Sequence, residues 1–218
     1  MLIEQRQNKI ITVIGHKGYG KTALTEALML MYNKPTIIAD PRFQYSTFQN
    51  RRLSFQSVGK FRKWIYNTAN FKVFYKYKLE LIVNAFDDTF DELASIVAQM
   101  RSLMFVVDEV DMFLDPRATK KNSLNKIIQY GRHHEIDIIS TSRRPANISR
   151  NLTSQTDIFY FSRLREPTDK LYIKQAIGAE YVSLVENLDR FSFLEFEDEE
   201  HHKIITTSKN DLEILQKG

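Results

Sequence analysis

The sequence predicts a three-layer α/β fold with a mostly parallel central sheet, helices on both faces and a small C-terminal β-hairpin. Apolar runs of strand length alternate with amphipathic helical stretches, the pattern of sheets built from strand–helix–strand units. Runs such as LMFVV at 103–107 are apolar throughout, as in strands that are buried on both faces. The composition, 43% hydrophobic and 27% charged over 218 residues, is typical of a globular protein.

The first half of the chain begins with a strand and a helix. KIITVI at 9–14 is a continuous apolar strand, and 23–31 is rich in the helix formers Ala, Leu and Met without an internal breaker. PTIIAD at 35–40 is the next strand, which the Asp40-Pro41 step ends. The elements predicted after it are a loop at 41–56, a helix at 58–67, an alternating strand at 71–77 and a strand at 79–85.

The second half continues the alternation and closes with a hairpin. TFDELASIVAQMR at 89–101 has the apolar period of a helix, with Thr89 as N-cap and Glu92 three residues later, the spacing of a capping box. LMFVV follows as a buried strand. The remaining predicted elements are a helix at 124–130, strands at 136–140 and 157–161, helical residues from 168 to 188 broken at Gly178, and a hairpin of FSFLEF and HKIITT across the acidic turn 197–200.

These elements predict a single domain over residues 1–218, with a core at about 9–175 and a helical and hairpin extension at about 176–218. The formal net charge of +4 is compatible with contact to polyanions. The lack of cysteine excludes disulfides, thiolate metal sites and cysteine nucleophiles. No apolar run approaches the ~20 residues that cross a bilayer, and charged residues precede the first apolar run. The sequence therefore predicts neither a membrane segment nor a secretory signal.

The clearest motif lies between the first strand and the first helix. It is Gly15-His16-Lys17-Gly18-Tyr19-Gly20-Lys21-Thr22, which fits the phosphate-binding pattern G-x-x-x-x-G-K-[ST] in its required strand–helix context. Its glycines allow backbone amides to turn around phosphate oxygens at the start of a helix. We expect Lys21 to reach the β- and γ-phosphates of ATP and Thr22 to bind Mg²⁺, while His16 and Lys17 shape the loop.

A second motif places two carboxylates at the end of an apolar strand. In LMFVVDE, Asp108 and Glu109 follow the strand directly, at the edge where parallel sheets bind ligands. This is the Walker B pattern of a phosphate-loop protein. We expect Asp108 to hold Mg²⁺ and Glu109 to orient a water for in-line attack on the γ-phosphate. The glutamate favours nucleotide hydrolysis over transfer to a substrate hydroxyl.

Arginines flank the strand predicted at 136–140. Arg132 precedes it, and Arg143 and Arg144 follow it. Charge that develops on a γ-phosphate needs a cationic partner, which a neighbouring subunit can donate as an arginine finger. Arginines on loops are also commonly solvated surface residues, so composition alone does not select among them.

Four segments together resemble one superfamily. GHKGYGKT, LMFVVDE, GRHHEIDIISTSRRP and SQTDIFYFSRLREPTD are similar to the FtsK–HerA superfamily of ring-forming, DNA-pumping ATPases. The short chain resembles, within it, the genome-packaging ATPases of membrane-containing icosahedral viruses. The resemblance covers about residues 9–175 and implies a P-loop NTPase fold.

The resemblance also implies roles for two arginines. Arg132 corresponds to the arginine that the family supplies in trans, and Arg143 stands where the family usually has a polar sensor glutamine. Arg143 could sense the γ-phosphate by its charge, or Ser142 could take over the sensor hydrogen bond.

The implied ligands are ATP and Mg²⁺. The implied partners are double-stranded DNA, further copies of the chain in a homo-oligomeric ring (hexamer or pentamer), and capsid or vertex proteins. The resemblance implies no membrane insertion and a place in the host cytoplasm or the virion.

Two basic stretches are candidates for DNA contact. One runs from Lys60 through Trp64 and on to Lys78, where aromatic residues either stack on bases or pack in the protein, and we favour packing. The other is the loop after the Walker B strand, with Arg117, Lys120 and Lys121.

Other functions remain open at this point. The alternatives are a filamentous-phage-type assembly ATPase that moves coat protein, a cellular or plasmid DNA-pumping ATPase of the same superfamily, and a non-translocating P-loop nucleotide switch or kinase. Glu109 and the arginines around the strand at 136–140 argue against the switch and the kinase.

Overall fold

A computed structural model describes residues 8–45, 52–67, 70, 78–84, 87–114, 123–207 and 214–216. The chain forms two compact units. The first unit consists of Met1–Ile10, Lys34–Asp108 and Thr119–Ile139, and the second unit of Ile11–Asn33, Glu109–Ala118 and Ser140–Gly218.

The first unit is built on a parallel sheet with the strand order β5-β2-β4-β3. Its strands are β2 (Thr36–Asp40), β3 (Arg52–Phe55), β4 (Lys78–Ile82) and β5 (Leu103–Val107). Thr36 of β2 pairs with Met104 of β5 on one side and with Lys78 of β4 on the other. Every residue of β2 and β5 is buried, and apart from Thr36 and Asp40 at the two ends of β2 these residues are apolar.

Helices with one apolar face accompany this sheet. They are α2 (Val58–Ile65), α4 (Thr89–Val97), α5 (Ser123–Tyr130) and a 3-10 helix at Gly131–His134. In α2, Ser57 caps the helix by accepting a hydrogen bond from the Lys60 N–H, and the residues at helical spacing, Val58, Phe61 and Ile65, are buried.

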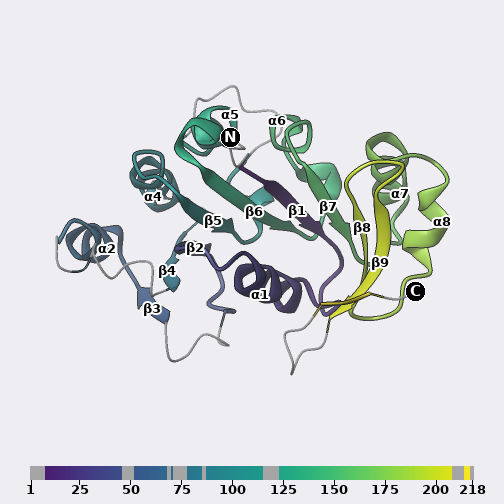
Figure 1. The fold of residues 1–218 in the computed structure, drawn as a ribbon, viewed down its shortest axis with the longest axis horizontal. Helices are drawn as coiled ribbons and strands as arrows, with labels where there is room; N and C mark the ends of the chain where they lie inside the picture. The colour runs from purple at the N-terminus through teal and green to yellow at the C-terminus, as the bar shows by residue number, and fades with distance from the viewer. Residues whose placement is uncertain are drawn as a thin grey trace, which may run out of the picture. The chain divides into compact units, whose positions relative to one another are not determined.

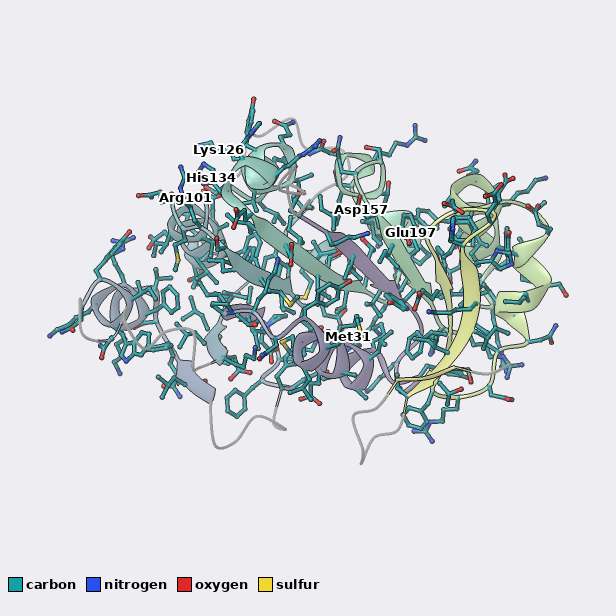
Figure 2. All side chains as sticks on the ribbon, viewed as in Figure 1. Met31, Arg101, Lys126, His134, Asp157 and Glu197 are labelled. Atoms are coloured by element: carbon teal, nitrogen blue, oxygen red, sulfur yellow. The ribbon has the colours of Figure 1, made fainter. Side chains whose placement is uncertain are left out.

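The second unit combines parallel and antiparallel pairing in the strand order β10-β9-β8-β7-β1. Its strands are β1 (Ile10–Ile14, of which Ile11–Ile14 belong to this unit), β7 (Ile158–Phe161), β8 (Ser192–Phe196), β9 (His202–Thr207) and β10 (Ile214–Gln216). β1 and β7 are parallel, with Ile11 opposite Ile158, whereas β8 and β9 form an antiparallel hairpin at the yellow end of the colour scale in Figure 1. Glu197, labelled in Figure 2, begins the turn of this hairpin.

The helices of the second unit include the one that follows the phosphate loop. They are α1 (Lys21–Tyr32), α6 (Arg150–Thr153), α7 (Pro167–Ala176), α8 (Tyr181–Glu186) and the 3-10 helices Val110–Met112 and Pro145–Asn147. α1 buries most of its central residues, while Met31 near its end is exposed (Figure 2).

Strand β6 (Ile136–Ser142) contributes residues to both units, Ile136–Ile139 to the first and Ser140–Ser142 to the second. In the first unit, the Ile138 N–H donates to the Lys9 carbonyl, and in the second the Gly15 N–H donates to the Ser142 carbonyl. β6 is therefore hydrogen-bonded to Lys9, which precedes β1, and to Gly15, which follows it.

The predicted α/β fold, with its mostly parallel strands and its C-terminal hairpin, is confirmed. The loop predicted at 41–56 is wrong at its end, because Arg52–Phe55 form the edge strand β3. This strand is short and has only two apolar residues, so it depends on its pairing with β4 and on packing against the following helix α2. The Phe55 ring lies 5.4 Å from that of Phe61 and 5.9 Å from that of Trp64.

The structure differs from the predicted elements at two further places. The N-cap of α4 is Asp88 and not Thr89, which is the first residue of the helix and donates its N–H to Asp87 Oδ1. Strand β10 was not predicted. The strand predicted at 71–77 lies outside the described residues.

Candidate nucleotide site

The phosphate loop, Gly15–Thr22, joins β1 to α1 in the second unit. Gly18 and Gly20 have φ angles of 82° and 96°, a region in which L side chains are strained. Gly20 is the N-cap of α1, and its carbonyl accepts the Leu24 N–H. Lys21 Nζ donates to the carbonyls of Gly15, at 2.8 Å, and of His16, at 3.4 Å. The loop thus folds back toward its own lysine at the positive end of a helix, a geometry suited to anions.

Two glycines of the loop have no room for a side chain. A β-carbon on Gly15 would lie 1.7 Å from Ser162 Oγ, and one on Gly20 would lie 2.6 Å from Cδ1 of Phe191. These contacts keep the backbone close to its neighbours and leave the loop amides, rather than side chains, to line the cradle. The residues present therefore fit a nucleotide polyphosphate.

Glu109 takes an unusual backbone conformation at the start of the second unit's 3-10 helix. Its φ and ψ are 52° and 51°, left-handed values that are uncommon for a residue with a side chain. Its N–H donates to Thr141 Oγ1 at 3.0 Å, and the residue is 5% exposed. Such a conformation persists only where surrounding contacts hold it, and it is common at functional sites.

Arg143 is the ionic partner of Glu109. Its Nε lies 2.5 Å from Glu109 Oε1, although the N–H does not point along this line and the contact is electrostatic rather than a directed hydrogen bond. Arg143 follows directly after β6, whose Ser142 carbonyl holds the Gly15 N–H. The end of β6 thus connects the phosphate loop to Glu109, and the structure brings Glu109 and Arg143 together.

Ser142 is committed to other partners. Its hydroxyl donates to Asp111 Oδ1 at 2.8 Å and accepts the Arg144 N–H at 3.1 Å. A hydroxyl has one proton to donate. The Ser142 proton is therefore already donated to Asp111.

Asp108 belongs to the first unit. It is 4% exposed, and the hydroxyl of the fully buried Tyr45 donates to its Oδ1 at 3.1 Å. Tyr45 lies just after a tight turn in which both carboxylate oxygens of Asp40 accept backbone amides, those of Arg42 and Gln44. Asp40 therefore has a structural role, and through the turn it places Tyr45 beside Asp108.

Arg132 also belongs to the first unit and lies in the 3-10 helix after α5. It is exposed, and among the described residues its guanidinium has no ion-pair partner. Nearby basic residues are exposed as well, on α5, on the turn after α4 and in the same 3-10 helix: Lys126, Arg101 and His133. Figure 2 labels Lys126 and Arg101 in this part of the unit, together with His134. A basic, solvent-facing surface of this kind suits contact with another molecule.

Asp169 is a buried carboxylate near the loop, in the first turn of α7. Burial raises the pKa of Asp169 above its ordinary value, and the negative charge of Glu166 adds to the rise. His16 of the phosphate loop and Arg144 act in the opposite direction. Their influence shows that α7 brings a carboxylate within electrostatic range of the loop.

Sequence reasoning missed three residues that the structure places at these sites. Tyr45 contacts Asp108, Arg190 Nε donates to the Gly18 carbonyl at 2.9 Å, and Phe191 packs at Gly20. Tyr45 lies in a segment with no periodic pattern. Arg190 and Phe191 are far from the motif in sequence, and only their place at the start of the predicted hairpin could have drawn attention to them.

The candidate DNA-contact stretches are described only in part. On α2, Lys60, Arg62 and Lys63 are exposed, whereas the aromatic residues of this helix pack against Phe55, as the packing interpretation predicts for them. Residues 71–77, and Arg117, Lys120 and Lys121, lie outside the described residues. None of the helices in the described part of the chain has both the length and the apolar character needed to span a bilayer.

Solved structures of three proteins share this fold. The genome packaging NTPase B204 of Sulfolobus turreted icosahedral virus 2, in complex with AMP, is 19% identical with a TM-score of 0.72, over 90% of this chain and 96% of that chain. VirB4 of Thermoanaerobacter pseudethanolicus is 12% identical with a TM-score of 0.63, over 95% of this chain and 91% of that one. The cytoplasmic domain of the type VII secretion ATPase EccC of Thermomonospora curvata is 13% identical with a TM-score of 0.56, over 92% of this chain but 25% of that one.

These likenesses agree with the FtsK–HerA resemblance at the level of the fold. No curated protein sequence matches this chain. The model of the AAA domain family matches residues 4–141, well over half of the chain, and the match spans both the phosphate loop and the Walker B strand. The chain therefore belongs to the AAA domain family and is a P-loop ATPase.

Proposed function

We propose that this ATPase assembles as a ring and translocates double-stranded DNA, packaging a viral genome into a preformed capsid. The observation that carries the proposal is the likeness to a genome packaging NTPase over 90% of this chain and 96% of that chain. Of the other two proteins compared above, VirB4 has a lower TM-score, and EccC has a lower TM-score and is matched over only 25% of its chain. The four segments that resemble the FtsK–HerA superfamily support the same reading.

ATP with Mg²⁺ is the proposed ligand of the phosphate loop. The loop amides and Lys21 would hold the β- and γ-phosphates, and the Thr22 hydroxyl would bind Mg²⁺. On the sequence argument, Asp108 is the second residue that holds the ion. When bound, Mg²⁺ neutralises charge on the phosphate oxygens.

Glu109 is the proposed base that orients water toward the γ-phosphate. Its burial excludes competing solvent, and the left-handed backbone, fixed by Thr141, sets the direction of its carboxylate. Arg143 fixes that carboxylate by charge and supplies a cation beside it. The two residues thus act as a coupled pair.

Arg132 is the proposed arginine finger, acting on the nucleotide of a neighbouring subunit. Its exposure on a basic surface supports action in trans. A contact in which each subunit supplies an arginine to the next is head-to-tail, and such contacts close into rings. A hexamer or a pentamer is the proposed assembly, with capsid or vertex proteins as further partners.

The first test is steady-state ATP hydrolysis with and without long double-stranded DNA, over a range of protein and salt concentrations. We expect DNA to stimulate turnover, the stimulation to rise steeply with protein concentration, and added salt to reduce it because phosphate contacts release counterions. Turnover that responds neither to DNA nor to protein concentration would overturn the motor proposal while leaving the ATPase in place.

A mixing experiment tests the finger. Arg132→Ala subunits should regain part of their turnover when mixed with Lys21→Ala subunits, because each subunit supplies what the other lacks at a shared interface. Mixtures that show no more turnover than the sum of the two variants would contradict a finger in trans. Lys126→Ala, which removes a neighbouring exposed cation, is the matched control and should need no partner.

A protein-moving ATPase is the second candidate, favoured by the likeness to the cytoplasmic domain of a type VII secretion ATPase. It predicts turnover that depends on protein concentration but is indifferent to DNA of any length. The hydrolysis assay above therefore separates the two functions.

A further inference from the structure

A corner of the C-terminal segment lies against the phosphate loop. Arg190 and Phe191 occupy this corner, just before β8. Arg190 Nε donates to the Gly18 carbonyl at 2.9 Å, across 172 residues of sequence. Phe191 approaches Gly20 so closely that a β-carbon there would meet its ring at 2.6 Å. Two successive residues thus contact two glycines of the same loop.

The backbone of the corner is held in place. Phe191 has a φ of 65°, a left-handed conformation that an aromatic residue rarely adopts. Its carbonyl accepts the Thr207 N–H at 2.9 Å, and the Ser192 N–H donates to the Asp189 carbonyl at 3.1 Å. The end of β9 therefore fixes a strained residue beside the loop, as is common at functional sites.

The Arg190 guanidinium is positioned and only partly used. Its central carbon lies 4.9 Å from the centre of the Phe191 ring, within cation–π range. One of its N–H groups is spent on Gly18, and no described residue accepts a hydrogen bond from its two terminal nitrogens. The side chain is exposed, so these donors and one planar face are open to a ligand.

The position of the guanidinium selects the part of the nucleotide that it can meet. In a phosphate loop the amides turn inward toward the phosphates. Because Arg190 is bound to a carbonyl of the loop, it lies on the outer rim and not in the cradle. In the proposed ATP site the nucleoside would extend from the cradle toward this rim, and a planar cation on an aromatic ring is suited to stack on a flat base.

We propose that Arg190 binds the nucleoside part of ATP by stacking its guanidinium on the base, with Phe191 as the platform behind it. The inference rests on the proposed ATP site in the phosphate loop. It assigns a nucleotide contact to the C-terminal hairpin segment of the same chain, and it makes this segment the element that distinguishes a nucleotide from a bare polyphosphate.

Calorimetric titration with ADP and with inorganic tripolyphosphate, both with Mg²⁺, tests the assignment. In Arg190→Ala we expect the Kd for ADP to rise about tenfold, the size of one good stacking contact, while the Kd for tripolyphosphate stays within about twofold. Arg190→Lys should behave like the alanine variant, because an ammonium has no planar face. Arg150→Ala removes an exposed arginine from the same unit and should bind both ligands like the wild type.

Several outcomes would overturn the inference. An unchanged ADP affinity in Arg190→Ala would remove the contact, and an equal loss for tripolyphosphate would assign the arginine to the phosphates. Full rescue by lysine would reduce its role to charge. A lower melting temperature together with loss of both ligands would make Arg190 a clamp on the loop. A wild-type protein that binds neither ligand would instead overturn the proposed nucleotide site itself.

Discussion

Arg143 and Glu109 form an ion pair, with 2.5 Å between Nε and Oε1, in which the carboxylate is almost fully buried and the guanidinium is a quarter exposed, at 6% and 25% of the side chains. Glu109 directly follows the Walker B aspartate, Asp108, and Arg143 directly follows β6. The carboxylate thus has its direction set by a side chain that also reaches solvent. If Glu109 acts as the proposed base, a ligand or protein group that displaces Arg143 from the carboxylate should change turnover.

Arg143→Ala should lower ATP turnover by about 100-fold or more while nucleotide binding is retained, because Glu109 loses the group that orients it. Arg143→Gln, which restores the residue usual in the resembling superfamily, should keep clearly more turnover than the alanine variant. Glu109→Gln is the reference for complete loss of the base, at about 100- to 10,000-fold. Turnover assays with parallel nucleotide-binding measurements check these values. Equal turnover in Arg143→Ala and wild type would make the ion pair incidental.

Gly15→Ala should destabilise the protein by about 1–3 kcal/mol through overpacking, because the new methyl group would overlap Ser162 Oγ. Ser162→Gly removes the obstructing side chain, so the double variant should recover most of the loss. Chemical denaturation of the two single variants and the double variant gives the coupling energy. Additive effects would mean that the clash is relieved elsewhere.

Tyr45→Phe should raise the Mg²⁺ concentration for half-maximal turnover about tenfold, because Asp108 loses the hydroxyl that orients it. The KM for ATP at saturating Mg²⁺ should change little, which distinguishes the effect from damage to the fold. Tyr130→Phe, at a tyrosine that is 60% exposed, is the matched control and should leave the Mg²⁺ requirement unchanged. The same Mg²⁺ requirement in Tyr45→Phe as in wild type would limit Tyr45 to a packing role.

Asp169→Asn should stabilise the fold near neutral pH, and the gain should shrink as the pH falls. Burial and Glu166 raise the pKa of Asp169 in the folded state, so folding is disfavoured at a pH where the carboxyl is charged in both states. As the pH falls through the raised pKa, the folded carboxyl takes up a proton and the penalty disappears. Melting temperatures of the variant and the wild type between about pH 4 and 8 check this. A difference that grows toward low pH would contradict it.

The parts of the fold that follow from local pattern were predictable. The mainly apolar runs of β1, β2 and β5 identify buried strands, and the glycine-rich motif between β1 and α1 places the loop. β3 was not predictable in the same way, because four residues with two apolar positions carry too little local signal. Thr89 was wrongly predicted as the N-cap because threonine is a good cap, whereas the helix already includes Thr89 and has Asp88 as its N-cap.

The candidate site likewise contains residues that the sequence predicts and residues that it does not. Lys21 and Glu109 stand in motifs with fixed spacing, so their positions could be inferred from sequence alone. The ion pair between Arg143 and Glu109 depends on how β6 ends, and the contact of Arg190 with Gly18 joins residues that no local pattern connects. Residues that meet only through non-local contacts have no fixed sequence spacing from which the contact could be predicted.

Strand β1 is synthesised long before β7, the strand with which it pairs. Thr12 and Thr156 share a 2.8 Å hydrogen bond across 144 residues, and β1 pairs with β7. At about 5–20 residues per second, the ribosome needs on the order of 10 s to supply that partner. Until then the first strand, all of whose residues are buried in the folded protein, lacks its partner β7. A chain that stops before β7 would therefore expose an apolar strand edge, and we expect such fragments to aggregate or to require a chaperone.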